Sequence, residues 1–285
     1  MNEVSDSIAA RRTMAILAVV FGLFVVIFGP TLIQSTLDAL VEKIATLIPT
    51  QPNMVLAGVL LPIFFIIFRG IDIVAGITLV LIAYPLWKGE KWAWPVALSC
   101  ISFPTLFGIY TSLPFLVQFG KPAPAALLLL LGLITFWTFL LIKVGSRIEK
   151  TARFFVFTML GIVPAHIIVL VNHGVKGLMD RPDKPLFTDP MITIYGFEAP
   201  MNFIAFVMCI IAIPLLASRK QSGWWLGLIA GVTVIIANYP THIIRMQTSD
   251  FLVAGTLGLL LTISLLIPAF KASLLGNQDP ATSMN

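Results

Sequence analysis

The three histidines of the chain all lie in its second half, at spacings that would let their side chains act together. His166 and His173 are seven residues apart, so they share one face of a helix. In another apolar stretch, His242 shares a face with Asn238 and Arg245. Imidazoles from two helices can ligate heme iron axially or hold a transition metal such as copper or zinc. The spacing predicts a heme- or metal-binding site at His166, His173 and His242, or proton exchange with a quinone.

Two other apolar stretches contain a carboxylate beside a second polar residue. Asp72 follows Arg69 by three residues, and Asn202 follows Glu198 by four, so each pair shares a helical face. An ionisable group inside hydrocarbon costs about 2.5–3.5 kcal/mol on insertion scales and usually faces a bundle interior or a cavity. We therefore expect a buried polar set, with Arg69 and Glu198 placed to form an ion pair: Arg69, Asp72, Glu198, Asn202, Asn238 and Arg245.

A purely structural interpretation of the same residues stays open. The four charged members of the set would cost little at the outer membrane interface, where long side chains reach water. His166 could bind a backbone carbonyl, and His173 could belong to a loop. Because no short ligand motif such as H-E-x-x-H is present, the spacing alone does not decide between ligation and packing.

The composition indicates which elements must position these side chains. Of 285 residues, 58% are hydrophobic and 11% are charged, whereas a soluble domain carries about 25% charged residues. A membrane span needs roughly 20 apolar residues, because only a helix of that length satisfies its backbone inside a hydrocarbon layer. The sequence predicts an all-α, polytopic membrane bundle with about eight transmembrane helices: 13–33, 66–87, 93–117, 123–143, 152–173, 195–217, 223–246 and 250–270.

The distribution of basic residues predicts the orientation of the bundle. Lys and Arg are enriched in cytoplasmic loops, and an even number of spans puts both ends on one side. With both termini in the cytoplasm of a cell (cytoplasmic) membrane, eleven of the 18 basic residues fall at or beside the inner face. These are Arg11, Arg12, Lys88, Lys91, Lys143, Arg147, Lys150, Arg153, Arg219, Lys220 and Lys271.

Two longer stretches, 34–65 and 174–194, are expected outside the cell. Residues 35–48 have the apolar spacing of an amphipathic helix lying on the membrane surface. The run from 54 to 87 would make a helix about 50 Å long, so we expect a bend or break near Pro62 or Gly70. A ninth crossing before Arg69 is the alternative, although it would weaken the charge bias.

Two segments of the chain resemble one another. LIAYPLWKGEKWAWPVAL, from Leu81, aligns with IIAIPLLASRKQSGWWLGL, from Ile210. Phe103-Pro-Thr and Phe115-Leu-Val have counterparts in Tyr239-Pro-Thr and Phe251-Leu-Val, again twelve residues apart. These matches predict a tandem duplication of a four-helix unit, with 1–146 as the first membrane unit and 147–285 as the second. Chance similarity between apolar sequences is the alternative.

Three functions fit these features. The first is a redox (heme or quinone) or metal-binding module with an outward-facing histidine pocket, part of a larger membrane complex. The second is a transporter for a small solute or ion, and the third is a non-catalytic scaffold subunit held by other membrane proteins. No nucleotide-binding loop or hydrolase motif is present, and the scattered basic residues do not indicate nucleic acid binding. Lipid is the expected partner.

Overall fold

Ten helices and no strand make up the part of the chain that the structure describes, residues 6–52, 54–179, 189–245 and 249–276 of a computed structural model. The prediction of an all-α fold is confirmed. The helices are α1 (Ile8–Ile27), α2 (Gly29–Leu47), α3 (Met54–Lys88), α4 (Ala93–Phe119), α5 (Ala126–Ile142), α6 (Arg147–Met179), α7 (Pro190–Ala217), α8 (Gln221–Arg245), α9 (Asp250–Leu266) and α10 (Pro268–Leu275).

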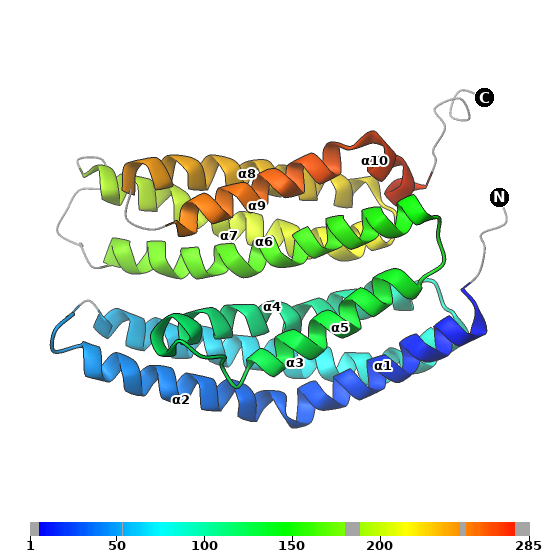
Figure 1. Ribbon diagram of the computed structural model, residues 1–285, viewed down its shortest axis with the longest axis horizontal. Coiled ribbons are helices and arrows are strands. Elements are labelled where there is room, and N and C mark those ends of the chain that lie inside the picture. The colour runs from blue at the N-terminus through cyan, green and yellow to red at the C-terminus, as the bar shows by residue number, and fades with distance from the viewer. Residues whose placement is uncertain (1–5, 53, 180–188, 246–248, 277–285) are drawn as a thin grey trace.

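The helices run back and forth along one long axis (Figure 1). We call one end of the bundle the linker end; it holds residues 6–12, 88–92, 143–147 and 218–221. The far end holds the last residues of α2, α4, α6 and α8. At the linker end, α10 turns away from α9 by 71°.

Two groups of helices lie side by side in this bundle (Figure 1). In the first group α1 packs on α3, α3 on α4, α4 on α5, and α5 returns to α1, while α2 covers α3 and α4. In the second group α6 packs on α7, α7 on α8, α8 on α9, and α9 returns to α6. Both groups are thus closed four-helix arrangements. They meet mainly where α4 contacts α6 and α7.

Six helices are long and apolar enough to cross a membrane, or seven if α9 and α10 together form one bent span. At 1.5 Å per residue, the 35 residues of α3 extend about 52 Å, beyond a hydrocarbon core about 30 Å thick. We expected a bend or a break near Pro62 or Gly70; helix α3 is continuous through both residues, so no break occurs there.

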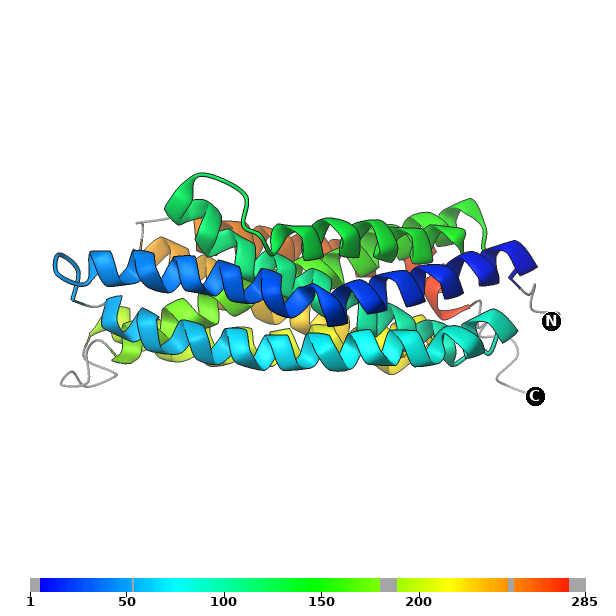
Figure 2. The same cartoon turned by 90° about the horizontal axis from the view of Figure 1, so that it is seen from below.

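The amphipathic segment near 35–48 is helical, but it packs on protein. Helix α2 follows α1 after a junction at Phe28, with Pro30 in its first turn, and runs in line with α1 beside α3 (Figure 2). Its apolar face is buried against α3 and α4. Thr36 also accepts a hydrogen bond from the backbone N–H of Ala125 (3.1 Å). The hydropathy pattern identified the buried face correctly, yet a pattern cannot tell whether lipid or another helix covers it.

Small residues bring α1 and α3 into close contact. A Cβ added at Gly22 would lie 2.7 Å from the carbonyl oxygen of Gly76, and one added at Gly76 would lie 2.9 Å from that of Gly22. Because lipid is as apolar as a helix surface, membrane helices associate through such close packing and not through a hydrophobic driving force. The Gly22–Gly76 crossing therefore fixes how closely α1 and α3 approach.

A buried tryptophan occupies the linker end of each group. In the first group the indole N–H of Trp94 donates to the carbonyl of Phe139 (3.4 Å), and Lys143 Nζ lies 4.9 Å from the ring centroid. In the second group Trp224 donates to the carbonyl of Leu265 (3.0 Å), and the ammonium of Lys271 lies 4.0 Å from the ring centroid. Both tryptophans are 4% exposed. Each one ties the third helix of its group to the fourth.

The turns that precede these tryptophans have the same backbone hydrogen bonds. The N–H of Gly89 donates to Leu86, and the N–H of Arg219 donates to Leu216, in each case at a positive φ (80° and 58°). The next residues, Glu90 and Lys220, donate to Pro85 and Leu215. Corresponding residues in the two turns are all 130 positions apart.

The second set of sequence matches does not follow this correspondence. Phe103 and Phe115 both lie on α4, whereas Tyr239 lies on α8 and Phe251 on α9. Residues at the same spacing thus occupy one helix in the first group and two helices in the second. This part of the sequence alignment was wrong, because spacing along the chain does not show where a helix ends.

We expect Gly22→Ala to lower the free energy of unfolding by about 1–3 kcal/mol, because the added methyl group meets a backbone carbonyl that cannot move aside easily. Thermal unfolding in detergent would measure this. Gly70→Ala and Gly161→Ala are matched controls with nothing within 4 Å of the added carbon, and they should be neutral or stabilising by up to about 1 kcal/mol. Equal losses in all three variants would contradict the close-packing explanation.

Candidate functional site

A hydrogen-bonded cluster of Glu198, Asn202 and Asn238 lies inside the second group of helices; we call it the Glu198 cluster. All three residues have 0% exposure. Asn202 donates to Glu198 Oε1 and, at 3.2 Å, to Asn238 Oδ1. Asn238 donates back to Asn202 Oδ1 (2.9 Å) and to the carbonyl of Val234 (2.8 Å). The cluster adds polar contacts to the packing of α7 on α8.

The second carboxylate oxygen of Glu198 has no hydrogen-bond partner among the described residues. It faces Gly174 of α6, where an added Cβ would lie 2.6 Å from this oxygen. Glycine at this position therefore leaves room for the carboxyl group between α6 and α7, where an added Cβ would also lie 2.8 Å from the Cβ of Ala199. A buried carboxylate with one unpaired oxygen is costly unless it takes up a proton or a ligand.

Further polar groups lie beside the Glu198 cluster, around the rings of Tyr195 and Phe251. The guanidinium of Arg245 is 5.9 Å from the ring centroid of Tyr195 and 5.3 Å from that of Phe251. His173 makes edge contacts with the same two rings, at 6.0 and 6.3 Å. Arg245 and Glu198 also interact electrostatically. Polar groups therefore continue from the far end down to the Glu198 cluster.

The three histidines have different surroundings. His166 donates from Nε2 to the backbone carbonyl of Asp250 (3.0 Å), at the start of α9. His173 lies half-buried between the rings just described, and neither ring nitrogen is hydrogen-bonded to a described residue. His242 is half-buried on α8 and has a polar or ring contact of its own. Over the described ranges, no group of three or more His, Cys, Asp or Glu side chains is placed to hold a metal ion.

Arg69 and Glu198 do not form the ion pair suggested by the sequence. Arg69 Nη1 instead donates to Gln34 Oε1 of α2 (3.1 Å), and Gln34 in turn donates to Asp38 (2.7 Å). The ion pairs recorded between described residues do not include Arg69. The sequence could not place the partner, because α2 was expected to lie away from the helices.

Asp72 is buried in the first group, separate from the other polar candidates. It is 1% exposed, and neither carboxylate oxygen has a hydrogen-bond partner among the described residues. Although Asp72 and Arg69 are one helical turn apart, only Arg69 reaches a polar neighbour. Asp72 therefore resembles Glu198 in burial and differs from it in having no amide beside it.

A polar contact between described residues joins the two groups of helices near the Glu198 cluster. Asn172 of α6 donates to the hydroxyl of Tyr110 on α4, which is 1% exposed. Residues 172–174 thus contact the first group through Asn172 and the Glu198 cluster through Gly174. Sequence reasoning missed Tyr110; a lone tyrosine inside an apolar helix was the available signal, because a buried hydroxyl needs a partner.

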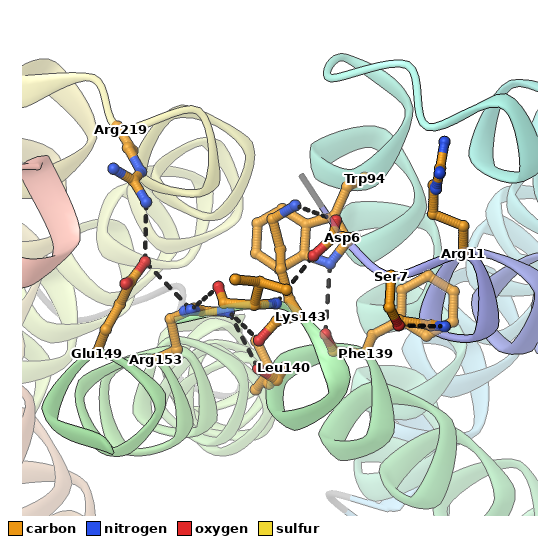
Figure 3. A network of polar contacts seen from close by, with 12 residues as sticks. Asp6, Ser7, Arg11, Trp94, Phe139, Leu140, Lys143, Glu149, Arg153 and Arg219 are labelled. Atoms are coloured by element: carbon orange, nitrogen blue, oxygen red, sulfur yellow. Dashed lines mark hydrogen bonds and ion pairs between the residues drawn. The ribbon is translucent and has the colours of Figure 1, made fainter. Parts of the chain in front are cut away.

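A network of ion pairs lies at the linker end (Figure 3), and the sequence did not predict it as a network. Asp6 pairs with Lys143 (2.9 Å), and Glu149 pairs with both Arg153 (3.1 Å) and Arg219 (2.9 Å). Arg153 is 4% exposed and donates to the carbonyls that end α5: Leu140, Lys143 and Val144. This linker-end network holds the connection between the two groups. In the sequence these residues indicated only orientation.

The two best-defined cavities lie away from the Glu198 cluster. One has a volume of about 20 Å³, enough for a single water, and lies between α4, α5 and α6 beside Thr105 and Thr158. The other is an open groove of about 420 Å³ between α3 and α4, lined by apolar side chains on either side of Gly70. Neither one is polar enough to suggest a catalytic site.

Comparison with known proteins does not extend the assignment: no protein-family model, no curated protein and no solved structure matches the chain. The fold itself defines the class. With six to seven helices that are long and apolar enough to span a bilayer, the chain is a multi-pass integral membrane protein.

We expect Asn202→Leu and Asp72→Leu to have opposite effects on stability. Asn202→Leu leaves Glu198 without a hydrogen-bond partner and Asn238 with only its bond to the carbonyl of Val234, and it should lower the free energy of unfolding by about 1–3 kcal/mol. Asp72→Leu removes an unpaired buried carboxyl and should be neutral or stabilising. Thermal unfolding in detergent separates the two; destabilisation by Asp72→Leu would reveal a partner that the contacts do not account for.

Proposed function

We propose that the chain crosses the membrane eight times, with the linker end in the cytoplasm. Besides the six long helices, α5 offers 17 apolar residues, and α9 with α10 offers a bent span. At 1.5 Å per residue α5 is about 25 Å long, close to the hydrocarbon thickness. All eleven basic residues assigned to the cytoplasm belong to elements that begin or end at the linker end.

We also propose that the two groups, 1–146 and 147–285, are tandem copies of one unit. Support comes from the paired tryptophans, each bonded to a carbonyl of the fourth helix under a lysine, and from the matching turns 130 residues apart. Hydropathy explains none of these features. Since each copy would contain four passes, both copies have the same orientation.

Cysteine labelling tests the number of crossings. In a background without Cys100 and Cys209, single cysteines would replace the exposed residues Gln51, Lys91 and Lys220. A membrane-impermeant maleimide added to intact cells should label Gln51→Cys alone, and the other two only after permeabilisation. Lys91 and Lys220 are separated by four helices, α4 to α7; if α5 does not cross, they will be labelled from opposite sides.

For function, we propose that Glu198 is a proton-binding group reached from the outer side, and that it couples protons to movement of a small solute or ion. The main support for this proposal is that Glu198 has 0% exposure and one carboxylate oxygen without a hydrogen-bond partner among the described residues. Within hydrocarbon, such a carboxyl group is most stable when protonated, and ionisable residues at this depth usually serve ion or proton pathways.

The distribution of polar residues supports access from the far end. Arg245 ends α8 at the far end, beside a ring that His173 also contacts, and towards the linker end many buried side chains are apolar, among them Cys209, Ala230 and Leu261. We infer that a proton or solute would reach the Glu198 cluster from the far end, past Arg245. A solute or proton bound there would reach the cytoplasm only after the two groups of helices rearranged.

A pH jump applied to proteoliposomes on a solid-supported electrode would test this proposal without a known substrate. We expect the wild type to give a transient charge displacement as Glu198 takes up or releases a proton. Glu198→Gln keeps the shape and the acceptor of Asn202 but cannot titrate, so its signal should fall well below that of the wild type. Glu42→Gln, which removes an exposed carboxylate on α2, is the matched control. An unchanged signal in Glu198→Gln would rule out this assignment.

A redox or metal-binding module is the second candidate function, because both ring nitrogens of His173 are unbonded among the described residues and the ring is half-buried. An absorption spectrum of the purified protein, oxidised and reduced, together with elemental analysis would test it. A heme band or stoichiometric metal lost in alanine variants of His166, His173 or His242 would favour this candidate. A colourless, metal-free protein without a proton signal would favour a scaffold subunit.

A further inference from the structure

Exposed cations and aromatic rings gather where α1 begins and α3 ends. We call this surface the α1–α3 corner. Tyr84, Trp87 and Trp92 are 67%, 46% and 52% exposed there, and Arg12 and Lys88 are exposed beside them. The full set is Arg11, Arg12, Tyr84, Trp87, Lys88, Lys91 and Trp92.

The cations of this corner are less neutralised than those of the neighbouring linker-end network. In that network each of Lys143, Arg153 and Arg219 has a carboxylate within 3.1 Å (Figure 3). Arg11, Arg12 and Lys88 form no ion pair with any described residue. The acid in the turn, Glu90, accepts a hydrogen bond from the indole of Trp92. The corner therefore keeps a net positive charge.

Aromatic rings and a backbone hydrogen bond position the cations of the α1–α3 corner. The guanidinium of Arg12 lies 5.1 Å from the ring centroid of Trp87, and Lys88 Nζ lies 5.4 Å from that of Tyr84. Arg11 donates to the carbonyl of Lys88 (3.1 Å), which ties α1 to the end of α3. Tryptophan and tyrosine rings concentrate at the membrane–water interface, so the cations that stack on them lie at the depth of lipid headgroups.

An apolar surface continues from the corner along α3. Leu81, Ile77 and Val74 are 71%, 46% and 64% exposed and lie on the same side of the helix as Tyr84. A ligand bound at the corner would therefore meet cations at one end and hydrocarbon-compatible side chains along the rest. A soluble anion would not contact the apolar side chains along α3.

We propose that the α1–α3 corner binds the headgroup of an anionic phospholipid. Arg12 and Lys88 contact the phosphate, Lys91 adds positive charge from the same turn, and the acyl chains lie along the exposed face of α3. Arginine offers a planar pair of donors that matches a phosphate, and lysine a point charge. The proposal does not depend on the function of Glu198.

Native mass spectrometry of detergent-solubilised protein, titrated with phosphatidylglycerol or phosphatidylcholine, tests this site. We expect tighter binding of phosphatidylglycerol, and its loss on replacing Arg12 and Lys88 by glutamine. Each cation near an anionic lipid changes binding by about fivefold, so the double variant should bind roughly 25-fold more weakly. Lys150→Gln/Lys220→Gln removes two cations at the same end of the bundle and should leave the binding unchanged.

Three results would overturn the proposal: equal loss in both double variants, retained binding in Arg12→Gln/Lys88→Gln, or displacement of the lipid by inorganic phosphate. Equal loss in both double variants would mean that the lipid is attracted by the overall charge of this end of the bundle. Displacement by inorganic phosphate would mean a simple anion site. If the glutamine variant fails to fold, the exchange Arg12→Lys/Lys88→Arg keeps both charges. It should retain the preference for phosphatidylglycerol, and a loss of that preference would also count against the site.

Discussion

Inside a bilayer no water is present to bond a polar group that the protein leaves unpaired, and most of this structure follows from that constraint. Buried hydroxyls bond back to the carbonyl one turn earlier, as Thr105 does to Ile101 and Thr262 does to Gly258. The buried indoles of Trp94 and Trp224 bond to carbonyls of the neighbouring helix. Where a carboxylate oxygen lacks a described partner, at Asp72 and Glu198, the exception indicates either a proton or a ligand.

Packing supplies the second requirement, because apolar side chains gain little from contact with each other when lipid is the alternative. Close approach at Gly22 and Gly76, and at Gly231 and Gly258, lets helices meet along their backbones. Glycine at 174 has a different purpose, since it leaves room for the carboxyl group of Glu198. The same residue type thus sets helix spacing at the Gly22–Gly76 and Gly231–Gly258 crossings and admits a polar side chain at Gly174.

The sequence predicted the helices and the buried faces better than the contacts between them. Periodicity placed Glu198 and Asn202 on one face of a helix, and both are buried. It could not show that Arg69 would find Gln34 and not Glu198, because that depends on where α2 lies. Likewise, Phe103 and Tyr239 share flanking residues but not their place in the fold, since a helix end leaves no reliable mark in an apolar sequence.

Under the proposed duplication, the two units have diverged mainly in their far halves. At the spacing of 130 residues fixed by the turns, Asn202 corresponds to Asp72, and Asn238 corresponds to Gly108. Both Asp72 and Asn202 are buried, but only the second unit has an amide on the facing helix that can bond the side chain. The tryptophan contacts at the linker end are nearly unchanged between the units. The contacts that both units need for packing are therefore alike. Among the described residues, the paired amides beside a buried carboxyl group occur in the second unit and not in the first. Such a difference is what we expect if the second unit has a specific function.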